Sequence, residues 1–224
     1  MAITTVVLDI DGTLLDSNDA HASAWREALR TVGVEVDLQR LREWIGMGGD
    51  QLLAQLGLSD ETEPGRTAAE RKQAIFRQRL LPVVQPFSGT RALLERMAEE
   101  GLRRVVATSA GRDELRDLLE RAGVDDLVHP AASGDSVDHS KPAPDVVSAA
   151  LERAGAIRGE AVMLGDTPYD LQAASRAGIQ MIALRCGGWT FDDGGPIAVY
   201  DDPADLLRHW DASPLRTATV APGR

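Results

Sequence analysis

The strongest constraint on the fold is a repeated alternation of short apolar runs with amphipathic segments. The apolar runs are too short for helices and are rich in β-branched residues, which is typical of buried strands. The intervening segments carry apolar residues at i, i+3 and i+4 and end at glycine, which favours helices that stop there. Strands that alternate with helices predict βαβ units and a doubly wound, parallel α/β sheet. The expected strands are residues 4–10, 103–109, 126–132, 160–166 and 179–185, and the expected helices between them are residues 112–123, 143–155 and 168–178.

One long interval interrupts this alternation. Residues 11–102 separate the first two strands, whereas a simple crossover between parallel strands needs only a dozen or more residues. Helical periodicity fills most of the interval, at residues 20–33, 38–46, 49–57 and 61–80, and the charged residues of the last segment are expected on a solvated face. We therefore expect an α/β core of residues 1–15 and 87–210, an inserted helical cap domain of residues 16–86, and a disordered tail of residues 211–224.

The composition limits where the protein acts and what it binds. With 35 acidic and 24 basic residues among 224, the net charge is −11, which repels nucleic acid and anionic membranes. No apolar run approaches the roughly 18 residues that span a bilayer, and the N-terminus lacks the basic region of a secretory signal. The single cysteine, Cys186, rules out an intrachain disulfide. We expect a cytoplasmic protein with no nucleic acid, membrane or obligate protein partner.

Short polar residues follow the expected strands, where ligands of open parallel sheets bind. Several carboxylates at one sheet edge need positive charge nearby, and Mg²⁺ is a hard cation that prefers oxygen ligands. A lysine before the fourth strand, Lys141, offers a second positive group. A free carboxylate, a metal ion, a lysine and hydroxyl donors together predict a phosphoryl-transfer site. The polar residues at the strand ends are Asp9 and Asp11, Thr108 and Ser109, and Asp166 with Asp170.

The same residues form four motifs that resemble those of the haloacid dehalogenase superfamily. The motifs are DIDGT at residues 9–13, VVATS at residues 105–109, KPAPD at residues 141–145 and GDTPYD at residues 165–170. They occur in the order and spacing of that family, and the resemblance covers about residues 4–210. The helical insertion after the first motif resembles the cap of the subgroup that contains phosphoglycolate phosphatase and β-phosphoglucomutase.

The resemblance implies the chemical roles of three aspartates. Asp9 would be the nucleophile and would form an aspartyl-phosphate, while Asp11 would protonate the leaving oxygen and then deprotonate the attacking water. The carboxylates of Asp9 and Asp166 and the backbone carbonyl of Asp11 would hold Mg²⁺. Because the side chain of Asp11 does not bind the metal, we expect it to hold a proton near neutrality.

The resemblance also implies how the phosphoryl group is bound. Thr108, the backbone amide of Ser109 and Lys141 would contact the phosphoryl oxygens. Asp170 would act indirectly, through contact with a metal-bound water or with Lys141. The alternative for Asp170 is a surface acid in the first turn of a helix, where carboxylates are favoured.

Two parts of the cap are candidates for substrate contact. His21 lies just after the expected hinge at residues 16–18, so it faces the cleft between cap and core or, alternatively, packs within the cap as we expect for Trp25. The segment GMGGD at residues 46–50 is expected as a loop facing that cleft, because each glycine inside a helix costs about 1 kcal/mol. Its candidate contacts are Gly48 and Gly49.

These features predict a Mg²⁺-dependent phosphatase that hydrolyses a small phosphorylated metabolite through an aspartyl-phosphate. A β-phosphoglucomutase-like sugar phosphomutase is the alternative, but residues 46–50 contain no arginine or lysine to hold a second phosphate. A silent ligand-binding relative is disfavoured because every expected catalytic residue is present, and a dehalogenase is disfavoured by Asp11. The sequence leaves the substrate and the oligomeric state open.

Overall fold

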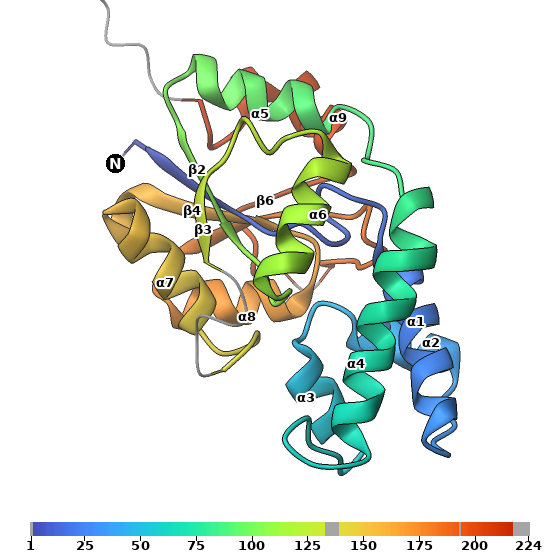
Figure 1. Ribbon diagram of the computed structural model, residues 1–224. Coiled ribbons are helices and arrows are strands. Elements are labelled where there is room, and N and C mark those ends of the chain that lie inside the picture. Colours follow the sequence, from blue (N-terminus) through green and yellow to red (C-terminus); the bar gives the residue numbers. More distant parts are fainter. Residues whose placement is uncertain (1, 133–138, 193, 217–224) are drawn as a thin grey trace, which may run out of the picture.

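The computed structural model describes residues 2–132, 139–192 and 194–216. Its centre is a parallel six-stranded sheet in the order β3-β2-β1-β4-β5-β6, shown in Figure 1. This confirms the predicted doubly wound α/β fold. The strands are β1 (Thr5–Leu8), β2 (Arg103–Ala107), β3 (His129–Ala132), β4 (Ala161–Gly165), β5 (Gln180–Leu184) and β6 (Ala198–Tyr200).

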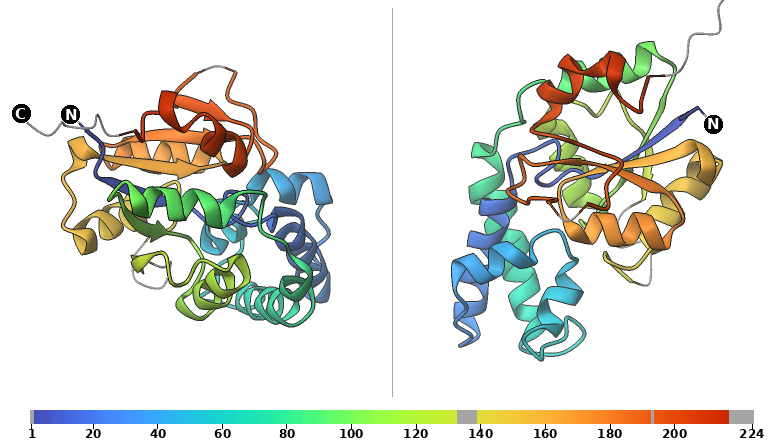
Figure 2. Two further views of the ribbon diagram at one scale, coloured as in Figure 1. Left: turned by 90° about the horizontal axis from the view of Figure 1, so that it is seen from above. Right: turned by 180° about the vertical axis from the view of Figure 1, so that it is seen from behind.

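Strand β1 lies at the centre because both of its faces are apolar and buried. Val6 and Leu8 pack into one hydrophobic cluster and Val7 into another, as the two-residue period of a strand requires. Helices α5 (Thr90–Glu99), α6 (Arg112–Ala122) and α9 (Pro203–Arg208) contribute to the first cluster, and α7 (Asp145–Ala154) and α8 (Pro168–Arg176) to the second. Helices therefore cover both faces of the sheet (Figures 1 and 2).

The chain order places a topological switch point at β1. After β1 the chain builds β2 and β3 on one side, and it then crosses back to build β4, β5 and β6 on the other. Strand β1 thus pairs with both β2 and β4, from Thr5 to Leu8 in each case. The carboxyl ends of these three strands meet at one place, which is where doubly wound sheets bind ligands.

Most of the residues between β1 and helix α5 form a helical unit beside that edge of the sheet (Figure 1). Its apolar side chains, including Trp25, Leu41 and Leu53, make a cluster separate from those of the sheet. The outgoing and returning segments pair where Asp16 N donates to Gln85 O at 3.0 Å, and we propose residues 16–86 as a cap domain on this basis. Its helices are α1 (Asn18–Thr31), α2 (Leu38–Trp44), α3 (Gly49–Ala54) and α4 (Gly65–Ile75), followed by a π-helical turn (Phe76–Leu80) and a 3-10 turn (Leu81–Val83).

The structure differs from the sequence-based expectation in several places. The segment 46–50 is only partly a loop, because Gly48 is the N-cap of α3 and Gly49 already lies in that helix. The expected disorder is wrong for residues 211–216, where a 3-10 turn (Trp210–Ala212) is followed by the fully buried Leu215, and residues 217–224 lie outside the described residues. Strand β6 and helices α5 and α9 were not predicted. In the described part of the chain, no helix is long and apolar enough to cross a membrane.

Truncating a side chain of the central strand should measure the contribution of this core. Leu8 is fully buried, so we expect Leu8→Ala to lower the free energy of unfolding by about 2–5 kcal/mol. Val83 is 70% exposed, and Val83→Ala should change it by less than about 0.5 kcal/mol. Urea unfolding of both variants tests this, and equal effects would contradict the assignment of β1 to the core.

Candidate active site

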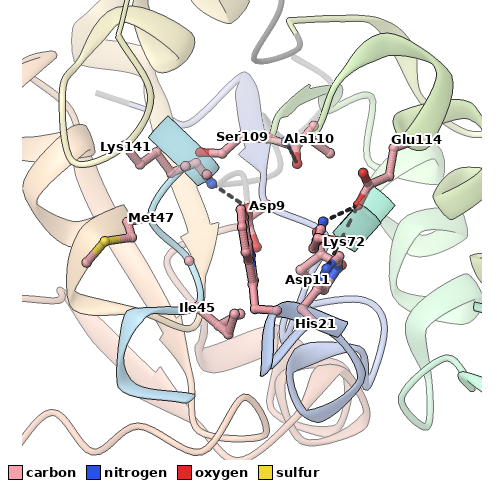
Figure 3. Close-up of a pocket in the computed structure, with 15 residues that line it drawn as sticks. Asp9, Asp11, His21, Ile45, Met47, Lys72, Ser109, Ala110, Glu114 and Lys141 are labelled. Atoms are coloured by element: carbon pink, nitrogen blue, oxygen red, sulfur yellow. Dashed lines mark hydrogen bonds and ion pairs between the residues drawn. The ribbon is translucent and has the colours of Figure 1, made fainter. Parts of the chain in front are cut away.

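The predicted motif residues meet at the carboxyl ends of β1, β2 and β4. Most of them line a cavity of about 80 Å³ that also receives residues from the cap (Figure 3). The core contributes Asp9, Asp11, Thr108, Ser109, Ala110, Glu114 and Lys141 to its lining. The cap contributes His21, Trp25, Ile45, Gly46, Met47, Gly48, Gly49 and Lys72. The cavity therefore lies between the two units.

Three buried carboxylates lie together beneath this cavity, and one lysine binds two of them. One oxygen from each of Asp9, Asp166 and Asp170 lies within 4.8 Å of the other two, and all three residues are at most 5% exposed. The Lys141 ammonium donates to Asp9 Oδ1 and, at 2.8 Å, to Asp170 Oδ1. Burial alone would lower the pKa of Lys141, but the two carboxylates outweigh it and raise the pKa. Lys141 is therefore held as a cation.

Neutral donors hold the carboxylate that the lysine does not reach. Thr13 Oγ1 lies 2.9 Å from Asp166 Oδ1 and 3.2 Å from Asp9 Oδ2, and Asn18 Nδ2 donates to Asp166 Oδ2 at 3.0 Å. Burial, followed by repulsion from Asp170 and Asp9, raises the pKa of Asp166 well above its ordinary value. Asn18, the first residue of α1, was not predicted, and its only signal in the sequence is its closeness to the first motif.

The charge balance of this cluster fits a divalent cation. Burial raises the pKa of Asp9 to about 7, with Lys141 opposing this shift and Asp170 and Asp11 adding to it. One lysine thus compensates three carboxylates only in part. Carboxylate oxygens are the donors that Mg²⁺ prefers, and Asp9 and Asp166 each present one within 4.8 Å of the other. The residues present therefore suit a hard divalent ion.

A helix cap fixes the position of Asp170. Its Oδ2 accepts from the backbone N of Thr167 at 3.1 Å and from the Thr167 hydroxyl at 2.7 Å, in a capping box at the start of α8. Its other oxygen is thereby free to accept from Lys141. Because Asp170 is 1% exposed, the alternative of a surface acid is wrong.

Asp11 points away from the acid cluster and toward the cap. Its Oδ1 lies 2.8 Å from His21 Nε2 and accepts from Ser17 Oγ at 2.5 Å. Burial would raise the pKa of Asp11, but attraction to His21 and the hydrogen bonds from His21 and Ser17 lower it to about 2. The expectation that Asp11 holds a proton near neutrality is therefore wrong for this arrangement, because the sequence did not reveal its contact with His21.

His21 combines both alternatives that the sequence left open. It faces the cavity and contacts Asp11, and its ring also stacks on Phe76 with 3.8 Å between ring centroids. Lys72 and Glu114, which the sequence analysis missed, also line the cavity. Lys72 Nζ donates to Glu114 Oε1 at 3.1 Å. The charged residues of 61–80 were expected on a solvated face, but the side chain of Lys72 is only 13% exposed.

The phosphate-binding candidates lie where β2 ends. Thr108 is 1% exposed, and its Oγ1 accepts from the backbone N of Ala110 at 3.1 Å. The hydroxyl oxygen of Ser109 is buried at the cavity and has no hydrogen-bond partner among the described residues. Thr108, Ser109 and Lys141 thus line the same cavity, and Figure 3 shows Ser109 close to Lys141.

The loop before α3 lies directly against the core motifs. A β-carbon at Gly48 would come within 2.1 Å of Ser140, and one at Gly46, where φ is +104°, within 2.6 Å of Thr167. The amide of Gly48 also donates to Lys141 O at 3.4 Å. Glycine is therefore required where the cap approaches the segments that carry Lys141 and Asp170.

Comparison with known proteins agrees with this geometry. The chain matches the haloacid dehalogenase-like hydrolase family over residues 6–184. It is 34% identical to the probable phosphatase IndB of Dickeya dadantii, covering 84% of this chain and 83% of that one, and 29% identical to a phosphoglycolate phosphatase of Rhodospirillum rubrum, covering 90% and 88%. The crystal structure of a hydrolase from Pseudomonas syringae superimposes with a TM-score of 0.86 at 32% identity, covering 93% of this chain and 98% of that one.

The buried carboxylates should make the metal-free protein less stable as the pH rises. The pKa of Asp9 is raised from 3.8 to about 7 on folding, so between these values the folded state binds more protons and the free energy of unfolding falls with rising pH. Asp9→Asn removes this titration, and its stability relative to wild type should increase over the same range. Urea unfolding in chelator at several pH values tests this, and a difference that is constant with pH would contradict it.

Proposed function

The chain belongs to the haloacid dehalogenase-like hydrolase family, and from this premise we propose that it is a Mg²⁺-dependent phosphatase that transfers the phosphoryl group of a small metabolite to Asp9. The relatives named above are phosphatases, and this supports the broader class of a phosphatase acting on small phosphorylated substrates. The observation that carries the proposal is Lys141, which binds Asp9 and Asp170 at the floor of the cavity.

Asp9 would act as the nucleophile, and its hydrogen bonds support this role. Lys141 and Thr13 hold its two oxygens, which fixes the plane of the carboxylate and reduces the entropy lost on reaching the transition state. An Asp9 oxygen forms the new bond to phosphorus while the ester P–O bond breaks. Water then attacks the aspartyl-phosphate and releases inorganic phosphate, which restores the carboxylate.

Asp11 and His21 would transfer the proton in both steps. The leaving oxygen needs a proton in the first step, and the attacking water loses one in the second. Asp11 would exchange this proton with substrate and water, although its low pKa in the resting arrangement means that it must first receive one. His21 Nε2, at 2.8 Å from Asp11, is the group positioned to share that proton.

Phosphoryl oxygens would be bound by Thr108, the amide of Ser109 and Lys141. Asp9, Asp166 and the backbone carbonyl of Asp11 would hold Mg²⁺, which when bound supplies the positive charge that the acid cluster and the phosphoryl group both need. His21, Gly48 and Gly49 would contact the substrate from the cap. The proposed location of the protein is the cytoplasm. A phosphomutase is not favoured, because residues 46–50 carry no cation for a second phosphate and Lys72, which also lines the cavity, is paired with Glu114.

Replacing the nucleophile should abolish turnover. We expect Asp9→Asn to lower kcat for p-nitrophenyl phosphate at least about 10³-fold, because the amide cannot form the phosphoryl intermediate. Phosphate release and acid-stable labelling of the protein by a radioactive phosphate ester measure the two steps. Asp125→Asn, an exposed acid outside the cavity, is the matched control. Labelling that persists in Asp9→Asn would show that another residue is the nucleophile.

Removing the donor that orients Asp166 should weaken metal binding. Asn18 Nδ2 holds both Asp166 Oδ2 and, at 3.1 Å, Gly187 O, so Asn18→Ala should reduce Mg²⁺ affinity about 10–100-fold. Calorimetric titration with Mg²⁺ measures this without substrate.

Activity should also disappear in excess chelator and return with Mg²⁺. Unchanged Mg²⁺ affinity in Asn18→Ala, or full activity in chelator, would contradict the proposed metal site.

A further inference from the structure

A larger cleft of about 630 Å³ continues outward from the catalytic cavity. It lies between the cap helices α3 and α4 and the start of α6, and it shares six lining residues with the cavity. If the phosphoryl group of an ester lies at Asp9, its leaving group must point away from the buried acid cluster. The cleft is the space that adjoins the cavity in that direction. The shared residues are Trp25, Gly49, Lys72, Ser109, Ala110 and Glu114.

The walls of this outer cleft are strongly acidic. Among its described lining residues there are five carboxylates and one basic side chain, Lys72. That lysine is paired with Glu114 at 3.1 Å, so its charge is already compensated. Asp50 has one buried oxygen without a hydrogen-bond partner among the described residues. The carboxylates are Asp50, Asp60, Glu61, Glu70 and Glu114.

This distribution of charge distinguishes the two ends of a substrate. The phosphoryl end would meet Lys141 and the proposed metal ion, whereas the leaving group would meet carboxylates with no free cation on the wall. A second negative charge there would be repelled over distances comparable with the Debye length of about 10 Å. Hydroxyl or ammonium groups, by contrast, could donate to these oxygens.

We propose that the outer cleft selects phosphate monoesters whose leaving alcohol carries no negative charge and bears hydroxyl or ammonium groups. The inference rests on the proposed phosphatase function. It also separates this chain from the Rhodospirillum rubrum relative, since phosphoglycolate, the substrate in that protein's name, carries a carboxylate in the leaving group.

Three two-carbon esters of similar size test the proposal. They are 2-phosphoglycolate, 2-hydroxyethyl phosphate and O-phosphoethanolamine, whose leaving groups are anionic, neutral and cationic. We expect kcat/KM for 2-phosphoglycolate to be at least about tenfold below that for 2-hydroxyethyl phosphate, with O-phosphoethanolamine equal to or above the neutral ester. The difference should shrink when the ionic strength rises from about 0.01 to 0.15 M.

A charge-neutralising variant links this selectivity to the cleft. Asp60→Asn, Glu61→Gln and Glu70→Gln in one protein should raise the ratio of kcat/KM for 2-phosphoglycolate to that for 2-hydroxyethyl phosphate about threefold or more. The matched control combines Glu99→Gln, Glu120→Gln and Glu152→Gln, three exposed acids outside the cleft, and should leave the ratio unchanged. A similar change in both proteins would assign the effect to net charge and overturn the proposal.

Equal or better turnover of 2-phosphoglycolate by the wild type would also overturn it. Equilibrium binding of the same three esters to Asp9→Asn in the presence of Mg²⁺ should follow the same order, measured by calorimetry. This measurement needs no turnover. Absence of Asp9-dependent hydrolysis of any ester would therefore refute the proposed function, whereas the binding order would still decide the selectivity of the cleft.

Discussion

The active-site region depends on one interaction, the buried ammonium of Lys141 between Asp9 and Asp170. Charged groups are costly to bury, and three carboxylates within 4.8 Å of one another also repel. The sheet alone brings Asp9 and Asp166 together, because β1 and β4 are adjacent and parallel. Lys141 arrives from the segment before α7 and binds both Asp9 and Asp170. Burial, and to a smaller extent the remaining negative charge, raises the pKa of Asp9. A divalent cation would compensate that remaining charge.

Two aspartates one residue apart are placed in opposite electrostatic surroundings by the strand end. Asp9 faces other carboxylates and has a raised pKa, whereas Asp11 faces His21 and Ser17 and has a lowered one. The cap thereby enters the chemistry directly, because His21 belongs to α1 and its ring is held in place by stacking on Phe76. A cap that moved away from the core would remove the partner of Asp11. The position of α1 and the pKa of Asp11 are thus linked through His21.

Most of the fold followed from the sequence, because buried parallel strands and glycine-terminated helices have distinct patterns. Strand β6 was missed because it is a half-buried edge strand of three residues, Ala198–Tyr200, too short to show a period. The motif residues were also predictable, since their positions after strands determine where they meet. Contacts between cap and core were not, because the pairing of Lys72 with Glu114 joins residues 42 positions apart whose charges look like ordinary surface charges. The state of Asp11 was mistaken for the same reason.

The two lysines that line the cavity differ in their partners. Lys141 binds Asp9 and would bind the phosphoryl group in the proposed mechanism, while Lys72, the basic residue among the described residues of the outer wall, is paired with Glu114. A net charge of −11 would by itself weaken the approach of every phosphate ester, so attraction must come from local groups. In the proposed site, local compensation at the phosphoryl end would restore binding of the one group that all candidate substrates share. The acidic outer wall would then act only on what differs among them, so the leaving group would be the part of the substrate that this site discriminates.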